Sequence, residues 1–232
     1  MKTIKQGDII SYLEMCSIEG TNLQRGMNFR LKGGTSVILM SVRAGAPYAD
    51  RIEQDGKILI YEGHDVSKDK SNTNPKSVDQ PMFNPNKSLT QNGKFFQAAQ
   101  RYKNDEAPPE LVKVYEKIRA GIWVYNGIFK LIDAWQEISN ARKVFKFKLE
   151  VADEINYKRE SNKEIEQSRL IPTSVKLEVW KRDEGKCILC KSRDNLHFDP
   201  IIPYSKGGSS LVAENIQLLC ARHNLEKRDK IK

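Results

Sequence analysis

The sequence predicts an α+β protein made of two modules. Three observations carry this prediction. Residues 1–152 contain several short apolar runs, some alternating with polar residues, as in half-buried strands. A charged segment with few large apolar residues follows, and we assign 153–171 to an exposed linker. Residues 172–232 contain a C-x-x-C and a C-x-x-H, a spacing typical of a small zinc-bound module.

Composition restricts the protein's environment and partners. The chain has 232 residues, a net charge of +9 and 30% charged residues. No apolar run approaches the roughly 18 residues of a membrane-spanning helix. The N-terminus has no apolar core with a small-residue cleavage site, so we expect a cytoplasmic protein without a membrane association. The excess of Lys and Arg favours a polyanionic partner such as nucleic acid, although many basic proteins bind none.

The first module is expected to be mostly β. Residues 1–35 are interpreted as strands and loops, 36–43 and 57–61 as strands, and 55–56 as a hairpin turn. A long polar loop over 63–86 precedes a helix over 88–101. Residues 111–118 could form a helix or a strand, and the alternation through 122–135 favours strands around a turn at 125–127. The strand 144–151 is expected to be half-exposed, with Lys146 and Lys148 on a solvated face.

The second module is expected to begin with a helix at Pro172, with Val175, Val179 and Trp180 on one side. A strand over 196–202, a loop at 205–209, a segment over 215–219 and a helix from Asn224 should follow. A module of about 60 residues has little core of its own, so a structural metal would stabilise it.

Four residues have the spacing of a tetrahedral zinc site: Cys187, Cys190, Cys220 and His223. Three thiolates and one imidazole are a common structural zinc set. The fourth cysteine in the chain, Cys16, is left over, which argues against a disulfide framework. By itself, such a set most often marks a purely structural zinc ribbon.

The order of motifs in the second module resembles the HNH nuclease family, whose core is a ββα-metal fold. The matching segments are WKRDEGKCILC, then FDPIIPYSKGG, then ENIQLLCARHNLEK. The resemblance implies that Asp199 and Asn224 ligate a catalytic divalent cation such as Mg²⁺, and that Asn215 orients the general base. Without it, Asp199 and Asn224 would be interpreted as a turn cap and a helix N-cap.

The family's general base is a histidine directly after the aspartate, and here that position is Pro200. Proline has no proton-accepting side chain. His197 is a poor replacement, because in a strand it shares a face with Asp199 whereas position 200 points to the other face. Either the natural protein has lost cutting, or this copy carries an inactivating substitution; the intact remainder of the motif favours the second.

The first module resembles the SRA (SET- and RING-associated, or YDG) domain, a PUA-like β-barrel with flanking helices. The matching stretches lie at 36–65, 79–100, 124–137 and 144–151, with Tyr125-Asn126-Gly127 at the YDG signature. The resemblance implies a pocket for a flipped, modified cytosine. Tyr48 and Tyr61 would stack on the base, and Asp50 would accept from its edge, although Arg51 is an alternative match. Ordinary strand packing is the other explanation for the two tyrosines.

Together, the two resemblances predict a modification-dependent DNA endonuclease that recognises 5-methylcytosine or 5-hydroxymethylcytosine by base flipping and restricts foreign DNA. One active site cuts one strand, so a double-strand break would need a homodimer or two molecules that meet on DNA. Two alternatives remain. The protein is a non-cutting reader of modified DNA, as Pro200 suggests, or it is a nicking or nonspecific nuclease whose first module reads another ligand.

Overall fold

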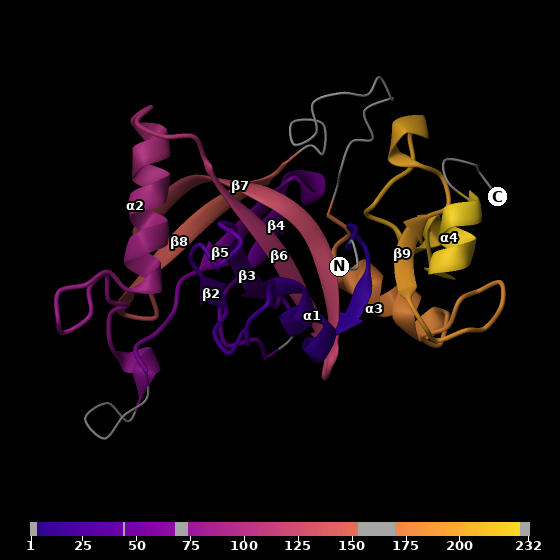
Figure 1. Cartoon of the computed structure of the whole chain (residues 1–232), viewed down its shortest axis with the longest axis horizontal. Helices are drawn as coiled ribbons and strands as arrows, with labels where there is room; N and C mark the ends of the chain where they lie inside the picture. Colours follow the sequence, from indigo (N-terminus) through magenta and orange to yellow (C-terminus); the bar gives the residue numbers. More distant parts are fainter. Residues whose placement is uncertain (1–3, 44, 68–73, 153–169, 228–232) are drawn as a thin grey trace.

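The computed structural model describes residues 4–43, 45–67, 74–152 and 170–227. The α+β class is confirmed: a large mixed sheet with two helices precedes a small two-stranded module with two more (Figure 1). The predicted linker at 153–171 lies almost wholly outside the described residues. Among those described, no helix has the length and apolar character needed to cross a bilayer.

The large sheet follows the order β2-β3-β6-β7-β8-β5-β4, and β1 pairs with β7. All pairings are antiparallel except β3 with β6. Its strands are β1 (Ile9–Ser11), β2 (Met27–Asn28), β3 (Ser36–Met40), β4 (Arg51–Glu53), β5 (Ile58–Glu62), β6 (Glu110–Arg119), β7 (Ile122–Ser139) and β8 (Arg142–Val151).

Two helices flank this sheet. Helix α2 (Gln91–Lys103) matches the predicted helix, and its N-cap Thr90 accepts a hydrogen bond from the Gly93 N–H. Helix α1 (Tyr12–Glu19) was missed, because 1–35 was interpreted as strands and loops. Its signal was present: Ser11 and Glu14 form a capping box, the S-x-x-E pattern that marks a helix start.

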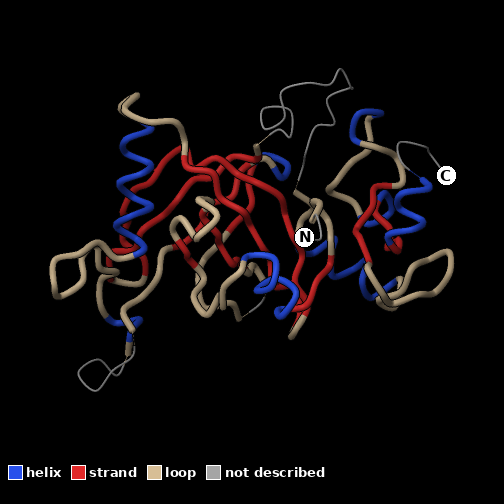
Figure 2. Tube along the Cα trace, in the orientation of Figure 1, coloured by secondary structure: helices blue, strands red, loops and turns tan. Residues whose placement is uncertain are grey.

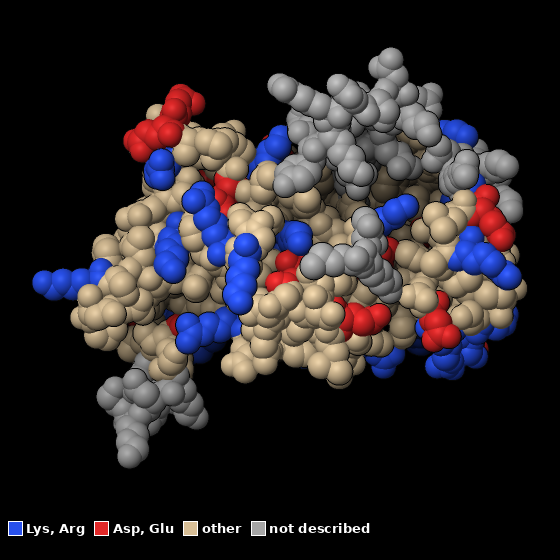
Figure 3. Space-filling model, in the orientation of Figure 1, with Lys and Arg blue, Asp and Glu red and all other residues tan. Residues whose placement is uncertain are grey.

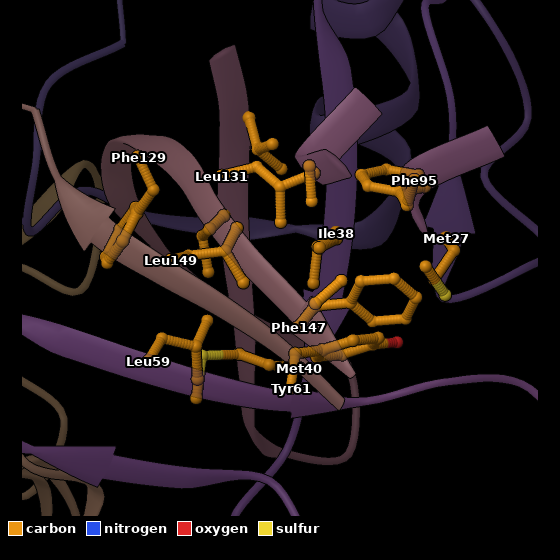
Figure 4. Packing of buried hydrophobic residues seen from close by; sticks show 14 of the residues in the cluster. Met27, Ile38, Met40, Leu59, Tyr61, Phe95, Phe129, Leu131, Phe147 and Leu149 are labelled. Carbon is orange, nitrogen blue, oxygen red and sulfur yellow. The ribbon is translucent and has the colours of Figure 1, made fainter. Parts of the chain in front are cut away.

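The main core is enclosed by the curved large sheet and α2. Side chains from β2, β3, β5, β7, β8 and α2 point toward one another, with Phe95, Phe147 and Tyr61 among the largest (Figure 4). Burying such aromatic side chains stabilises each by roughly 1.5–3 kcal/mol relative to exposure. The sheet and α2 therefore form one packed unit.

The predicted turn at Tyr125-Asn126-Gly127 is wrong. The chain turns earlier, at Gly121, and all three residues lie inside β7. Pairing shifts from Lys113↔Ile128 to Tyr115↔Tyr125, so Asn126 and Gly127 together oppose a single residue of β6. Gly127 has φ +95°. The Asn-Gly signal therefore makes a β-bulge within a strand instead of a hairpin turn.

The solvated face predicted for Lys146 is also wrong. This side chain is buried, and its Nζ lies 2.9 Å from the Glu62 carboxylate. Glu62 also pairs with Arg142 at 3.5 Å, and Arg142 pairs with Asp65 at 2.6 Å. The alternating pattern predicted an exposed position for Lys146 because a local pattern carries no information about an acidic partner on another strand, here Glu62 on β5.

The second module contains α3 (Thr173–Arg182), β9 (Leu196–Pro200), β10 (Ile216–Cys220) and α4 (Ala221–Lys227). β9 and β10 pair antiparallel, with Asp199 opposite Gln217 and Pro200 opposite Ile216. The predicted helix at Pro172 is confirmed as α3, with Val175 and Val179 buried. Helix α4 begins three residues before the predicted Asn224. This module lies at one end of the molecule, and α2 lies at the other (Figure 2).

Candidate functional sites

The three residues predicted to form a base pocket line one cavity. This cavity has a volume of about 640 Å³ and lies between the ends of β3 and β5, the 45–50 loop and the residues before β2. We call it the aromatic cavity. Its lining includes Tyr48, Asp50, Tyr61, His64, Arg25 and Arg43. Its volume falls within the roughly 300–1,000 Å³ of small-ligand sites.

Asp50, and not Arg51, faces the aromatic cavity. Its carboxylate accepts hydrogen bonds from the Glu62 N–H (3.0 Å) and the Ser41 N–H (3.3 Å). Arg51 is exposed and pairs with Glu53. Burial raises the pKa of Asp50 to about 7, although the two backbone N–H groups oppose this shift. The alternative match to Arg51 therefore places no side chain in the cavity.

The two tyrosines differ in their surroundings. Tyr61 is buried in the main core and reaches the cavity with its hydroxyl group, which lies 3.3 Å from His64 Nε2. Tyr48 is half-buried, and Lys76 Nζ lies 4.0 Å from its ring centroid. Tyr61 therefore has the packing role considered from sequence as well as a place in the cavity wall.

His64 was not predicted for this site. Its ring stacks on Tyr48 with the centroids 5.7 Å apart and an interplanar angle of 18°. Asn92 holds its backbone, accepting from the His64 N–H and donating to the His64 carbonyl. Burial lowers the pKa of His64 to about 4, so its imidazole is neutral at pH 7. Its position three residues beyond the strand signal at 57–61 was the available clue.

The four predicted zinc ligands converge. Their ligand atoms all lie within 4.8 Å of one another, and Cys190 Sγ and Cys220 Sγ are 3.7 Å apart. His223 Nδ1 lies 3.3 Å from Cys187 Sγ and 3.4 Å from Cys220 Sγ. Tetrahedral zinc with Zn–S bonds of about 2.3 Å separates two sulfur atoms by about 3.8 Å. The set therefore fits zinc in both chemistry and spacing.

The surroundings of Cys187 favour the thiolate form of its side chain. Burial raises its pKa, but the backbone N–H groups of Cys190, Cys220 and Leu189 outweigh this effect and lower the pKa to about 6. A thiolate is the form that binds zinc. Cys187 is therefore largely ionised at neutral pH.

Asp199 on β9 is buried, and its carboxylate contacts side chains from β10 and α4. Its Oδ2 accepts a hydrogen bond from Gln217 Nε2 (3.0 Å) and lies 2.8 Å from Lys227 Nζ. Lys227 also donates to the Pro200 carbonyl at 2.6 Å. Asn224 precedes Lys227 by three positions on α4, which puts both on one helix face. Lys227 was noted in the motif but given no role.

Asn215 holds the loop between β9 and β10. Its side-chain amide accepts from the Ile202 N–H (2.8 Å) and donates to the carbonyls of Ile202 (3.1 Å) and Ser209 (2.9 Å). Gly208 packs so closely there that a Cβ would lie 1.9 Å from the Ile202 carbonyl oxygen. The conformation of the loop that follows Pro200 therefore depends on Asn215.

His197 pairs with Asp8, which is not a predicted site residue. Its Nδ1 lies 2.5 Å from the Asp8 carboxylate, at the boundary between the two modules. This agrees with the sequence argument that His197 is a poor substitute for the missing base. Its partner is 189 positions away in the chain, so the sequence pattern gave no sign of the pair.

Basic side chains gather on one face of the molecule. Figure 3 shows several Lys and Arg side chains close together over the strands next to α2. The acidic side chains on this face are more scattered. Such a surface suits a polyanion.

Comparison with known proteins identifies both modules. The sequence model of the SAD/SRA domain matches residues 1–154, and that of the HNH endonuclease matches 187–230. No curated protein matches.

Solved structures resemble part of this chain. One is a SUVH5 SRA complex with hemi-methylated CG DNA (23% identity, 66% of this chain, 91% of that chain, TM-score 0.45). Another is SUVH5 SRA bound to fully hydroxymethylated CG DNA (22%, 64%, 89%, TM-score 0.44). Arabidopsis thaliana SUVH6 with SAM is a third (17%, 75%, 28%, TM-score 0.40).

Proposed function

The chain belongs to the SAD/SRA domain family and carries an HNH endonuclease domain after it, and we propose that it is a modification-dependent DNA endonuclease. The observation that carries the proposal is the convergence of Tyr48, Asp50 and Tyr61 on one cavity. In this proposal the first domain binds duplex DNA that contains 5-methylcytosine or 5-hydroxymethylcytosine. The second domain hydrolyses a phosphodiester bond nearby.

The reading step requires the modified base to leave the duplex and enter the aromatic cavity. Tyr48 offers a half-buried ring face at the cavity wall, and Tyr61 forms part of that wall. Asp50 supplies the polar group for the base edge. Stacking compensates for part of the cost of unstacking and unpairing, a few kcal/mol. The aromatic and acidic residues together provide both recognition elements.

Tyr48→Ala is expected to weaken binding to a modified-cytosine duplex by roughly 5- to 150-fold. This range corresponds to the loss of about 1–3 kcal/mol from one base–aromatic stack. Fluorescence anisotropy with matched modified and unmodified duplexes would measure the loss. Tyr102→Ala, on α2 outside the cavity lining, is the control and should bind as the wild type does. An unchanged preference for the modified duplex in Tyr48→Ala would remove this residue from the pocket.

The raised pKa of Asp50 makes a second prediction. A protonated carboxyl group has one O–H donor and one acceptor oxygen, which complement cytosine N3 and the cytosine amino group. If the acid is the binding form, affinity should fall as pH rises through about 7, by roughly tenfold between pH 6 and pH 8. The same raised pKa means that Asp50's contribution to folding stability is fully present below the ordinary value of 3.8 and is lost as pH rises through about 7.

Asp50→Asn separates this effect from other titrations. The amide carries a donor and an acceptor at every pH, so the variant should bind modified DNA with a flatter pH profile. Binding of the wild type and Asp50→Asn to the modified duplex is measured from pH 6 to 8, with the unmodified duplex as the baseline. A wild-type affinity that rises with pH would mean that the carboxylate is the binding form.

The cutting step would use the second domain's oxygen ligands. Asp199 and Asn224 offer the carboxylate and amide oxygens that suit Mg²⁺, and a cation there would neutralise charge on the scissile phosphate. A cation would share the Asp199 carboxylate with Lys227. The zinc set would be structural and would hold the segment of Cys187 and Cys190, which precedes β9, against α4. Restriction of foreign DNA and homodimerisation for double-strand cleavage are parts of the same proposal.

A non-cutting reader of modified DNA is the second candidate, and Pro200 favours it. Digests of two plasmids that differ only in cytosine modification distinguish the candidates. They are run with Mg²⁺, Mn²⁺ or Ni²⁺, using this chain and its Pro200→His variant. Cleavage of the modified plasmid alone supports the endonuclease. Binding without cleavage by either chain supports the reader, and equal cleavage of both plasmids excludes modified-base recognition.

A further inference from the structure

The two domains share a hydrophobic core. Strands β6 and β7 of the first domain contribute Ile118 and Val124, and α3 of the second contributes Val175 and Val179. Phe198 on β9 belongs to the same buried cluster. Because this core draws side chains from both domains, separating the domains would expose apolar side chains to water, which is unfavourable.

The N-terminal segment joins the two sheets. Strand β1 pairs with β7 on one side, with Ile9 opposite Val124. Just before it, the Gly7 carbonyl accepts from the Phe198 N–H (3.1 Å), and Asp8 forms a β-bridge with His197. Gly7 has φ +89°, and a Cβ there would lie 2.8 Å from the Phe198 carbonyl oxygen. The segment therefore lies between the reader's sheet and the nuclease's hairpin, beside the N-terminus in Figure 1.

A buried polar cluster fixes α3 on the reader. We call it the Glu116 cluster, and it consists of Glu116, Asn126, Thr173 and Lys176. Lys176 Nζ lies 2.5 Å from Glu116 Oε2 and donates to Asn126 Oδ1 at 2.7 Å. Asn126 donates to Glu116 at 3.0 Å, and the Thr173 hydroxyl donates to the same carboxylate.

Charges buried this deeply fix one docking geometry. Glu116 is 0% exposed and Lys176 is 1% exposed, so replacing one of them in the docked arrangement leaves the other buried without its partner. Breaking such a pair by removing one partner is strongly destabilising, because it leaves an uncompensated buried charge. Asn126 also donates to Met40 Sδ at 3.7 Å, and Met40 lines the aromatic cavity. The Glu116 cluster thus connects α3 to the cavity wall.

We propose that the reader and the nuclease act as one rigid body, and that this interface, not the length of segment 153–169, sets the distance between the modified base and the scissile phosphate. Glu116 and Lys176 are positioning residues in this arrangement. The part of the inference that concerns cleavage position rests on the proposed function. The rigidity can be measured without DNA.

The first test lengthens segment 153–169 of the full chain by about ten Gly and Ser residues. Such an insert adds a flexible span of roughly 5–6 Å × √n. Hydroxyl-radical footprints on a duplex with one modified cytosine should show the nuclease at an unchanged position. Cut sites of the same insertion in the Pro200→His background should also be unchanged. A footprint or cut site that spreads or moves with the insertion would overturn the inference.

The second test opens the interface. Lys176→Glu places two carboxylates in the buried cluster, and combined with the insertion it should spread the nuclease footprint over several nucleotides. Lys181→Glu makes the same charge change on the exposed face of α3 and should leave the footprint unchanged. Zinc content, expected to equal that of the wild type, checks that the second domain remains folded in both variants.

Small-angle scattering without DNA separates this inference from the proposed function. The insertion alone should keep the compact arrangement of the two domains, and the insertion with Lys176→Glu should extend it. Failure to prefer modified DNA in the wild type would refute the proposed reader but leave the scattering result as evidence for the rigid body. Extended scattering from the insertion alone would refute the rigid body even if modified DNA is bound.

Discussion

Pro200→His is expected to raise DNA cleavage by roughly 10²- to 10⁴-fold, the usual contribution of a positioned general base. Hydrolysis requires a water molecule to lose its proton near neutral pH, and an imidazole with a pKa of about 6.5 can accept it. The other motif residues, Asp199, Asn215 and Asn224, are already present. One side chain therefore separates this chain from the complete motif.

The structure can accept this change. Pro200 ends β9 opposite Ile216, and Lys227 bonds its carbonyl oxygen, a group that every residue has. The next backbone N–H, of Ile201, bonds the Asn215 carbonyl and is unaffected. Histidine at this position would supply an imidazole without removing any of these hydrogen bonds.

Pro200→Ala is the matched control for this prediction. It restores a backbone N–H at the same position without adding a proton acceptor, so it should leave cleavage at the wild-type level. Cleavage of a modified duplex by Pro200→His should increase as pH rises through about 6.5, because only neutral imidazole accepts a proton. Equal activity in the Ala and His variants would show that strand geometry, and not proton transfer, limits this chain.

Local signals were the part of the fold that sequence could predict. The Asp55-Gly56 pair lies between β4 and β5, which pair as an antiparallel hairpin. The zinc set could be predicted because its members lie in two close pairs, and tetrahedral coordination then restricts how those pairs meet. Only the structure shows that Asp50, and not Arg51, is the residue that faces the cavity. The two are adjacent, so a shift of one residue in register decides between them.

Interactions between distant residues could not be predicted. Lys146 and Lys176 look like surface lysines until Glu62 and Glu116, on other elements, are placed beside them. The Asn-Gly pair at 126–127 carries a turn signal that the long pairing of β6 with β7 overrides. Charge neutralisation and strand pairing at long range thus decide burial where local pattern suggests exposure.

Removal of zinc is expected to unfold the second domain. Structural zinc supplies roughly 10–16 kcal/mol of apparent binding free energy in zinc-finger peptides, comparable with the whole stability of a typical domain, about 5–15 kcal/mol. Cys187 and Cys220 belong to the core shared by both domains. Losing the metal should therefore weaken the docking of α3 on the reader as well as the nuclease fold.

Cys190→Ser tests this dependence most directly, because Cys190 is exposed and its replacement removes a ligand without opening a core cavity. The variant should lose bound zinc in native mass spectrometry, and residues 170–227 should exchange amide hydrogens rapidly. Cys16→Ser, at the only cysteine outside the zinc set, should keep one zinc per chain and normal protection. Protection of β9 and β10 that survives in metal-free Cys190→Ser would mean that docking on the reader, and not zinc, holds the nuclease domain together.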